Sequence, residues 1–169
     1  LIMTVTAIAN SNFLSVGNMT ALLKSIPFIA LATLGCSLCL NCGVLDISIG
    51  RVAGLCGMVF GYILDATGSL IAALACGIGC GLLFGFINAF LSINVGVDSF
   101  IVTMGTLYVA GGLRYMINSG DPITLPESYR NFSQATPLGI SWFFWIVLAI
   151  FVIVGFMQKK TEFGRRLYA

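Results

Sequence analysis

The chain consists of long apolar runs separated by short polar or glycine-rich breaks. Apolar runs that predict helices cover residues 25–40, 52–64, 69–93, 100–117 and 139–157. A membrane-spanning helix needs about 20 apolar residues, so the longest run predicts a full crossing, whereas 52–64 predicts a tilted or re-entrant segment. We expect residues 1–9 to be the last turns of another helix and residues 10–23 to be a loop with an interfacial helix. Pro27 is expected near a helix start, where proline is best tolerated.

Composition places these helices in a membrane. The chain is 59% hydrophobic and only 8% charged, whereas soluble domains carry about 25% charged residues. So few charges could not cover a soluble surface. The predicted fold is therefore all-α, a polytopic transmembrane helical bundle. We expect residues 1–169 to form a single transmembrane domain that is truncated at both ends, because the chain starts at Leu1 and stops after a basic cluster.

The basic cluster also predicts an orientation. Four cations follow the last apolar run: Lys159, Lys160, Arg165 and Arg166. Positive charge close to a helix end favours the cytoplasmic side. Counting backwards places the polar loop at residues 118–138 outside and Arg51 toward the cytoplasm, provided that residues 52–64 cross completely. Lys24 and Arg130 are exceptions on the outer side.

A glycine-bracketed break at residues 43–50, with the sequence GVLDISIG, carries Asp46 and Ser48 between two apolar runs. A mid-bilayer acid costs roughly 2.5–3.5 kcal/mol on insertion scales. Non-helical backbone at membrane depth is tolerated only where it is buried or lines a cavity. One interpretation is that Asp46 and Ser48 line a solute path. The alternative is structural: Asp46 pairs with Arg51, and Ser48 caps the helix that starts near Gly50.

Three further polar residues lie within apolar runs: Asn88, Thr103 and Thr106. An amide in a membrane helix commonly bonds across to another helix, and threonine commonly bonds back to its own backbone. The alternative is that all three line the same path as Asp46 and Ser48. Either Ser99 or Asp98 is expected to cap the helix that carries the threonines.

Small residues recur at helical spacing and predict close helix packing. The stripes are Ala73, Gly77, Gly81, Gly85 and Ala89 on one segment, and Gly57 and Gly61 on the segment before it. Four residues make about one helical turn, so each stripe forms a flat face that lets a neighbouring helix approach. The expected result is a compact bundle of many helices.

Enzyme and cofactor chemistry has little support in the sequence. The spacing of Cys36, Cys39 and Cys42 matches part of an iron–sulfur run, but no fourth ligand follows and buried cysteine commonly packs as a hydrophobe. The sequence has no His and no phosphate-binding loop. We therefore expect no metal and no cofactor in this chain, and no catalytic residue. Basic patches with interleaved aromatics are missing, so no nucleic-acid partner is expected.

The ordered motifs resemble those of permease subunits of bacterial ABC sugar importers, of the ribose/xylose/galactose type within the superfamily that includes branched-chain amino acid permeases. That family carries GGIDLSVG, GxxxGxxNG, PFIxTLGT and TxxGRxxYA in this order. The corresponding positions here are residues 42–50, 81–89, 99–106 and 161–169, with NFLS at 12–15 matching the family's opening NFx[ST].

The resemblance implies a gated conduit in the bacterial inner (plasma) membrane that translocates a monosaccharide without covalent chemistry. It implies cytoplasmic ATP-binding subunits as partners, so that ATP is bound by a partner subunit, together with a second permease copy or homologue and an extracytoplasmic sugar-binding protein. The basic cluster would lie near the ATPases or anionic membrane lipid. The expected substrate path is Asp46, Ser48, Asn88, Thr103 and Thr106.

Other functions remain open at this point. A branched-chain amino acid ABC permease shares the architecture. A secondary transporter or channel is a further alternative, in which Asp46 would bind a coupling ion or proton. A membrane redox protein using the cysteine run is the most distant alternative.

Overall fold

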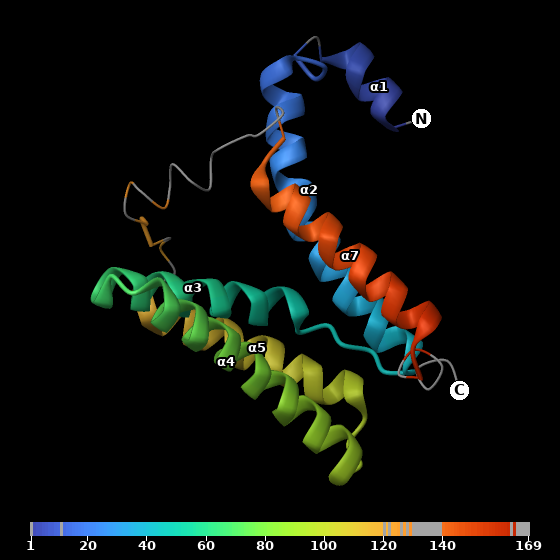
Figure 1. Cartoon of the computed structure of the whole chain (residues 1–169), viewed down its shortest axis with the longest axis vertical. Coiled ribbons are helices and arrows are strands. Elements are labelled where there is room, and N and C mark those ends of the chain that lie inside the picture. The colour runs from blue at the N-terminus through green and yellow to red at the C-terminus, as the bar shows by residue number, and fades with distance from the viewer. Residues whose placement is uncertain are drawn as a thin grey trace. The chain divides into compact units, whose positions relative to one another are not determined.

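The computed structural model describes residues 2–10, 12–119, 121, 123–125, 127, 129, 140–162 and 164. Its elements are helical, with no strand in these ranges (Figure 1). They are α1 (Ile2–Ala9), α2 (Val16–Asn41), α3 (Ile49–Thr67), α4 (Leu70–Ala89), the π-helix η1 (Phe90–Asn94), α5 (Ser99–Asn118) and α7 (Trp142–Lys160).

Five of these helices are long and apolar enough to cross a membrane: α2, α3, α4 continued by η1, α5 and α7. The all-α, polytopic prediction is therefore confirmed. The short-segment prediction for residues 52–64 is wrong, because α3 extends beyond both ends of that run and reaches 19 residues. The basic-cluster orientation needs a complete crossing here, and α3 has the required length.

The N-terminal prediction also needs correction. Residues 16–23 are the first turns of α2 rather than part of a loop, and Pro27 lies inside this 26-residue helix. Proline removes one N–H donor from a helix and usually kinks it. Pro27 is buried.

The chain divides into two compact units, which are described separately. The first comprises Leu1–Leu34 and Arg130–Leu167, and the second Gly35–Tyr129. In the first unit, Ser141 caps α7 by accepting a hydrogen bond from the backbone N–H of Phe143. The rings of Phe28 and Phe143 lie 5.6 Å apart, and Val147 is buried. Aromatic and aliphatic contact thus supplies the packing of α7 in this unit.

Gly43 terminates α2 through backbone geometry that favours glycine. Its φ is +71°, a left-handed conformation that costs glycine nothing. The N–H of Val44 donates to the carbonyl of Cys39, and the N–H of Gly43 donates to that of Leu40. These two bonds form a Schellman C-cap. The chain then runs without regular structure through residues 44–48 before α3 begins.

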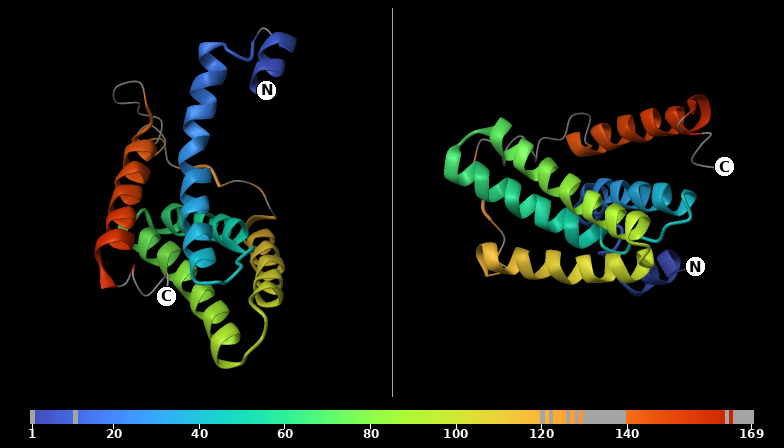
Figure 2. Two further views of the ribbon diagram at one scale, coloured as in Figure 1. Left: turned by 90° about the vertical axis from the view of Figure 1, so that its right-hand side faces the viewer. Right: turned by 90° about the horizontal axis from the view of Figure 1, so that it is seen from below.

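The second unit is built from α3, α4 and α5, which pack against one another (Figure 2). Their core contains Leu55, Phe84 and Ala110, one residue from each helix. Gly77 and Gly81 bring α4 close to α3. A Cβ on Gly77 would lie 3.3 Å from the carbonyl oxygen of Cys56, and one on Gly81 would lie 3.3 Å from the sulfur of Cys56.

The other glycines of the predicted stripes have different surroundings. A Cβ on Gly61 would lie 3.4 Å from Ile123, which follows α5. Gly57 and Gly85 have nothing within 4 Å of that position. Close approach is therefore found at Gly77, Gly81 and Gly61, while Gly57 and Gly85 leave open space.

Replacing Gly77 by Leu is expected to destabilise the protein by about 1–3 kcal/mol, the usual cost of overpacking. The clash is with backbone, which cannot rotate away. Gly79→Leu is the matched control, because nothing lies within 4 Å of its Cβ position on the same helix. Denaturant unfolding of the two variants measures the difference; equal stability would contradict this packing of α3 on α4.

Candidate functional site: a polar relay between two helices and a non-helical segment

Four of the five predicted path residues form a continuous hydrogen-bonded relay. Thr106 on α5 donates through Oγ1 to Oδ1 of Asn88 on α4. Asn88 donates through Nδ2 to Oγ of Ser48, 3.2 Å away. Ser48 in turn donates to Oδ1 of Asp46, at 2.6 Å. The relay therefore joins α5, α4 and the segment before α3, and ends at a carboxylate.

Burial makes this relay energetically important. Ser48, Asn88 and Thr106 are 1%, 8% and 7% exposed, respectively. A buried polar group that lacks a hydrogen bond is costly, and no buried side-chain nitrogen or oxygen in the described residues is left without a partner. Each polar side chain in the relay has the next one as its hydrogen-bond partner, so removing one member leaves its neighbour without that partner.

Hydroxyls on α5 hold the non-helical segment. The backbone N–H of Leu45 donates to Oγ of Ser99, and that of Ile47 donates to Oγ1 of Thr103, both at 3.4 Å. Thr103 Oγ1 also lies 3.4 Å from the carbonyl oxygen of Leu45 and from that of Phe100 on its own helix. Thr103 thus combines the predicted back-bond with a contact across to the segment, and Asp98 rather than Ser99 caps α5.

The two specific structural alternatives, an Asp46–Arg51 ion pair and a Ser48 cap, are not found in the described residues. No ion pair joins Asp46 to Arg51 among the described residues; Oδ1 instead accepts from the N–H and the hydroxyl of Ser48. Ser48 stands at the N-cap position of α3 but makes no side-chain capping bond; its Oγ accepts from Nδ2 of Asn88 instead. The other carboxylate oxygen, Oδ2, accepts no hydrogen bond from the described part of the chain.

Two cavities flank the relay. One, of about 290 Å³, lies between α3 and α4 and includes Cys56 and Phe84 in its lining. The other, of about 220 Å³, includes Cys39 and Ser92. Asp46, Gly85 and Asn88 line both. Because Gly85 has nothing within 4 Å of its Cβ position, it keeps the space beside the relay open.

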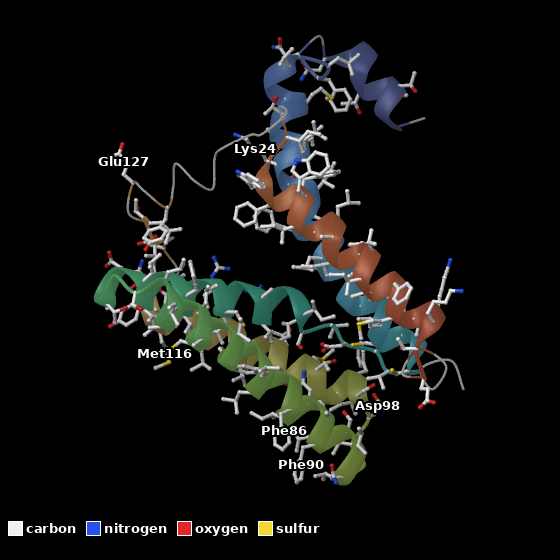
Figure 3. The ribbon with its side chains drawn as sticks, in the orientation of Figure 1. Lys24, Phe86, Phe90, Asp98, Met116 and Glu127 are labelled. Carbon is white, nitrogen blue, oxygen red and sulfur yellow. The ribbon has the colours of Figure 1, made fainter. Side chains whose placement is uncertain are left out.

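The site has a defined position along the helices. It lies toward the end of the unit where Asp98 begins α5 and Phe90 continues α4, whereas Met116 marks the opposite end of α5 (Figure 3). The site offers a carboxylate, an amide and hydroxyls on otherwise apolar walls. Such groups can exchange hydrogen bonds with a polar, uncharged solute. No cluster of three potential metal ligands occurs among the described residues.

The predicted cationic group is only partly described. Lys159 and Lys160 are exposed in the last turn of α7, while Arg165 and Arg166 lie outside the described residues. Sequence reasoning missed Ser99 as a partner of Leu45, and also the order in which the path residues bond. The path residues lie near helix ends in the sequence, which indicated that they could lie together. The sequence did not indicate which of them bond to each other.

These features define a multi-pass helical membrane protein with a polar site among its helices. The family described as branched-chain amino acid transport system / permease component matches residues 18–169. The chain belongs to this family.

Curated relatives match nearly the whole chain. The L-arabinose ABC transporter permease protein AraH of Azospirillum brasilense is 28% identical over 94% of this chain and 47% of its own length. The autoinducer 2 import system permease protein LsrC of Salmonella typhimurium is 29% identical over 95% of this chain and 46% of its own length. LsrC of Escherichia coli is 28% identical over 93% of this chain and 46% of its own length. The chain spans about half the length of these relatives. No solved structure matches it.

Thr106→Val should lower the free energy of unfolding by about 0.6–2 kcal/mol, the range for a hydrogen bond between membrane helices. The substitution removes the donor to Asn88 while keeping the shape. Thr33→Val is the control, because Thr33 Oγ1 donates to the carbonyl of Ile29 in its own helix. Unfolding titrations in detergent compare the two; equal losses would argue against a relay between helices.

Proposed function

We propose that the complete protein is the membrane-spanning permease subunit of an ABC importer that carries a monosaccharide across the bacterial inner membrane. The observation that carries this proposal is the relay from Thr106 to Asp46, lined by cavities on both sides, in a chain of this permease family. The permease supplies a gated path, and ATP is bound and hydrolysed by partner subunits.

The chemistry of the site supports a hydroxyl-rich solute. Asp46 lines both cavities, and its Oδ2 accepts no bond from the described residues, so we propose that this oxygen accepts from a sugar hydroxyl. A hydrogen bond contributes about 0.5–1.5 kcal/mol net between neutral groups and about 1.5–3 kcal/mol to a charged group. Weak binding at several groups suits a path that must release its solute.

Two of the similar proteins are named for an L-arabinose transporter and for an autoinducer 2 import system. These names support a sugar or sugar-like solute over a branched-chain amino acid. The family description names branched-chain amino acids, so leucine is the informative competitor in a transport assay.

Counting spans back from Lys159 and Lys160 sets the proposed orientation. With the lysines cytoplasmic and residues 119–141 taken as one external loop, α5 begins at the cytoplasmic side and α4 ends there. The start of α3 lies on the same side. The relay then occupies the cytoplasmic half of the path, with the external loop near an extracytoplasmic binding protein.

Reconstitution tests the proposal directly. The intact protein is purified with its co-purifying ATPase and soluble binding protein, and is inserted into liposomes with radiolabelled arabinose, galactose or leucine. The proposal expects sugar accumulation only with ATP, both partners and a permease pair. Accumulation by the polypeptide alone under a proton or sodium gradient would favour a secondary transporter and overturn the proposal.

Asp46→Asn in the complete transporter is expected to slow sugar uptake roughly tenfold, because a neutral acceptor binds a hydroxyl less strongly than a carboxylate does. Asn retains an oxygen that can accept from Ser48. Asp98→Asn is the matched control, since Asp98 caps α5 at an exposed position and Asn caps as well. Unchanged uptake in the Asp46 variant at normal expression would remove Asp46 from the path.

Gly85→Leu should block transport while leaving the fold intact. A leucine side chain there meets no atom within 4 Å at its Cβ and would project into the space beside the relay. We expect uptake to fall at least tenfold with normal thermal stability. Gly79→Leu, which adds the same side chain to the exposed face of α4, should transport normally; equal uptake by both variants would contradict this path.

A further inference from the structure

A second polar feature of the α3–α5 pair is a reciprocal crossing of two arginines. Nη1 of Arg51, on α3, lies 3.5 Å from the Cβ position of Gly111 on α5. Nη1 of Arg114, on α5, lies 3.5 Å from the Cβ position of Gly54 on α3. Each guanidinium therefore covers a glycine of the opposite helix, and the two crossings lie three residues apart on both helices.

Both guanidiniums lie well inside the helical spans. At 1.5 Å per residue, Gly54 is about 8 Å from the first residue of α3 and about 20 Å from its last. Gly111 is about 18 Å from the start of α5 and about 10 Å from its end. For each arginine, Cδ and Nη1 both lie within 4.0 Å of the same glycine Cβ position. The side chains therefore run across to the neighbouring helix, which differs from snorkelling toward a headgroup region.

Neither arginine has a counter-charge in the described part of the chain. No ion pair or hydrogen bond joins either guanidinium to another described residue. Charges in membrane spans are expensive unless they pair or face a polar cavity. A bound oxyanion would remove this cost.

A cavity adjoins this pair. It measures about 270 Å³ and is lined by Arg114, by Gly54, Gly57 and Gly61 of α3, and by apolar side chains that include Ile123 and Leu125. Arg114 is the only charged residue among these described lining residues. Guanidinium binds a carboxylate through two parallel N–H bonds, while the glycines and aliphatic side chains leave room for a small apolar body.

We propose that Arg51 and Arg114 form an oxyanion site between α3 and α5 that binds a carboxylate, with its apolar portion in the cavity over Gly57 and Gly61. The carboxylate is either that of a small organic acid or that of an acidic side chain from elsewhere in the assembled transporter. This site lies on a different face of α3 from the Asp46 relay, and it does not depend on the proposed function.

The test uses the complete protein in lipid nanodiscs with 3-methylbutanoate as the probe and 3-methylbutanamide as its uncharged match. Calorimetric titration should give an affinity at least tenfold higher for the acid than for the amide. Arg114→Gln should abolish the difference, and Arg51→Gln should reduce it. Gly57→Leu should also abolish acid binding without unfolding the protein, because its Cβ position is open. Lys24→Gln, which removes an exposed cation on α2, should bind as the original protein does.

A second arm separates the two sources of the carboxylate. If the original protein binds neither probe, but Arg114→Met lowers its melting temperature while Arg114→Lys does not, an acidic side chain within the transporter occupies the site. If neither probe binds and the Arg114→Met variant has the same melting temperature as the original protein, the proposal is overturned. Equal binding of acid and amide also overturns it. All readouts are binding and melting, so they remain informative whatever solute the transporter carries.

Discussion

The structure of the second unit depends on how the backbone N–H and C=O groups of a non-helical segment find hydrogen-bond partners in apolar surroundings. Gly43 ends α2, and five residues pass without helical hydrogen bonds before α3 begins. Lipid offers no partners for such backbone. The partners come from α5 and α4. The hydroxyls of Ser99 and Thr103 accept hydrogen bonds from backbone N–H groups of the segment, and Asn88 donates to Ser48. The polar site therefore exists where the break would otherwise be unstable, and the same bonds that stabilise the break create the site.

Glycine has two opposite roles in this helical packing. At Gly77 the backbone carbonyl of Cys56 is so close that a side chain would collide, and the missing Cβ permits helix contact. At Gly85 and Gly57 the missing Cβ leaves space beside a polar group, Asp46 in one cavity and Arg114 in the other. Four-residue spacing predicts a flat stripe in all of these cases. Only the neighbouring helix determines whether the stripe is covered.

Helical geometry also separates opposite charges within the unit. Residues of α3 spaced by three or four, including Val52 and Cys56, line the cavity beside Asp46, whereas Gly54 and Gly57 line the cavity beside Arg114. The two sets lie on neighbouring faces of one helix. A carboxylate relay and a guanidinium pair can thus occupy the same short span without neutralising each other, which leaves both available to other groups.

The sequence by itself determined the membrane class, the helical fold and the residues that needed an explanation, because charged and polar side chains are so costly in apolar surroundings that Asp46, Asn88 and the threonines stand out. It did not determine the full length of α3, whose glycines and Arg51 obscured the hydrophobic run, or the position of Pro27 inside α2. Tertiary structure alone decided that Asn88 bonds Ser48, that Arg51 crosses to Gly111, and that Gly85 borders open space. These outcomes depend on contacts between residues 18 to 60 positions apart, and no local pattern records which residues of neighbouring helices meet.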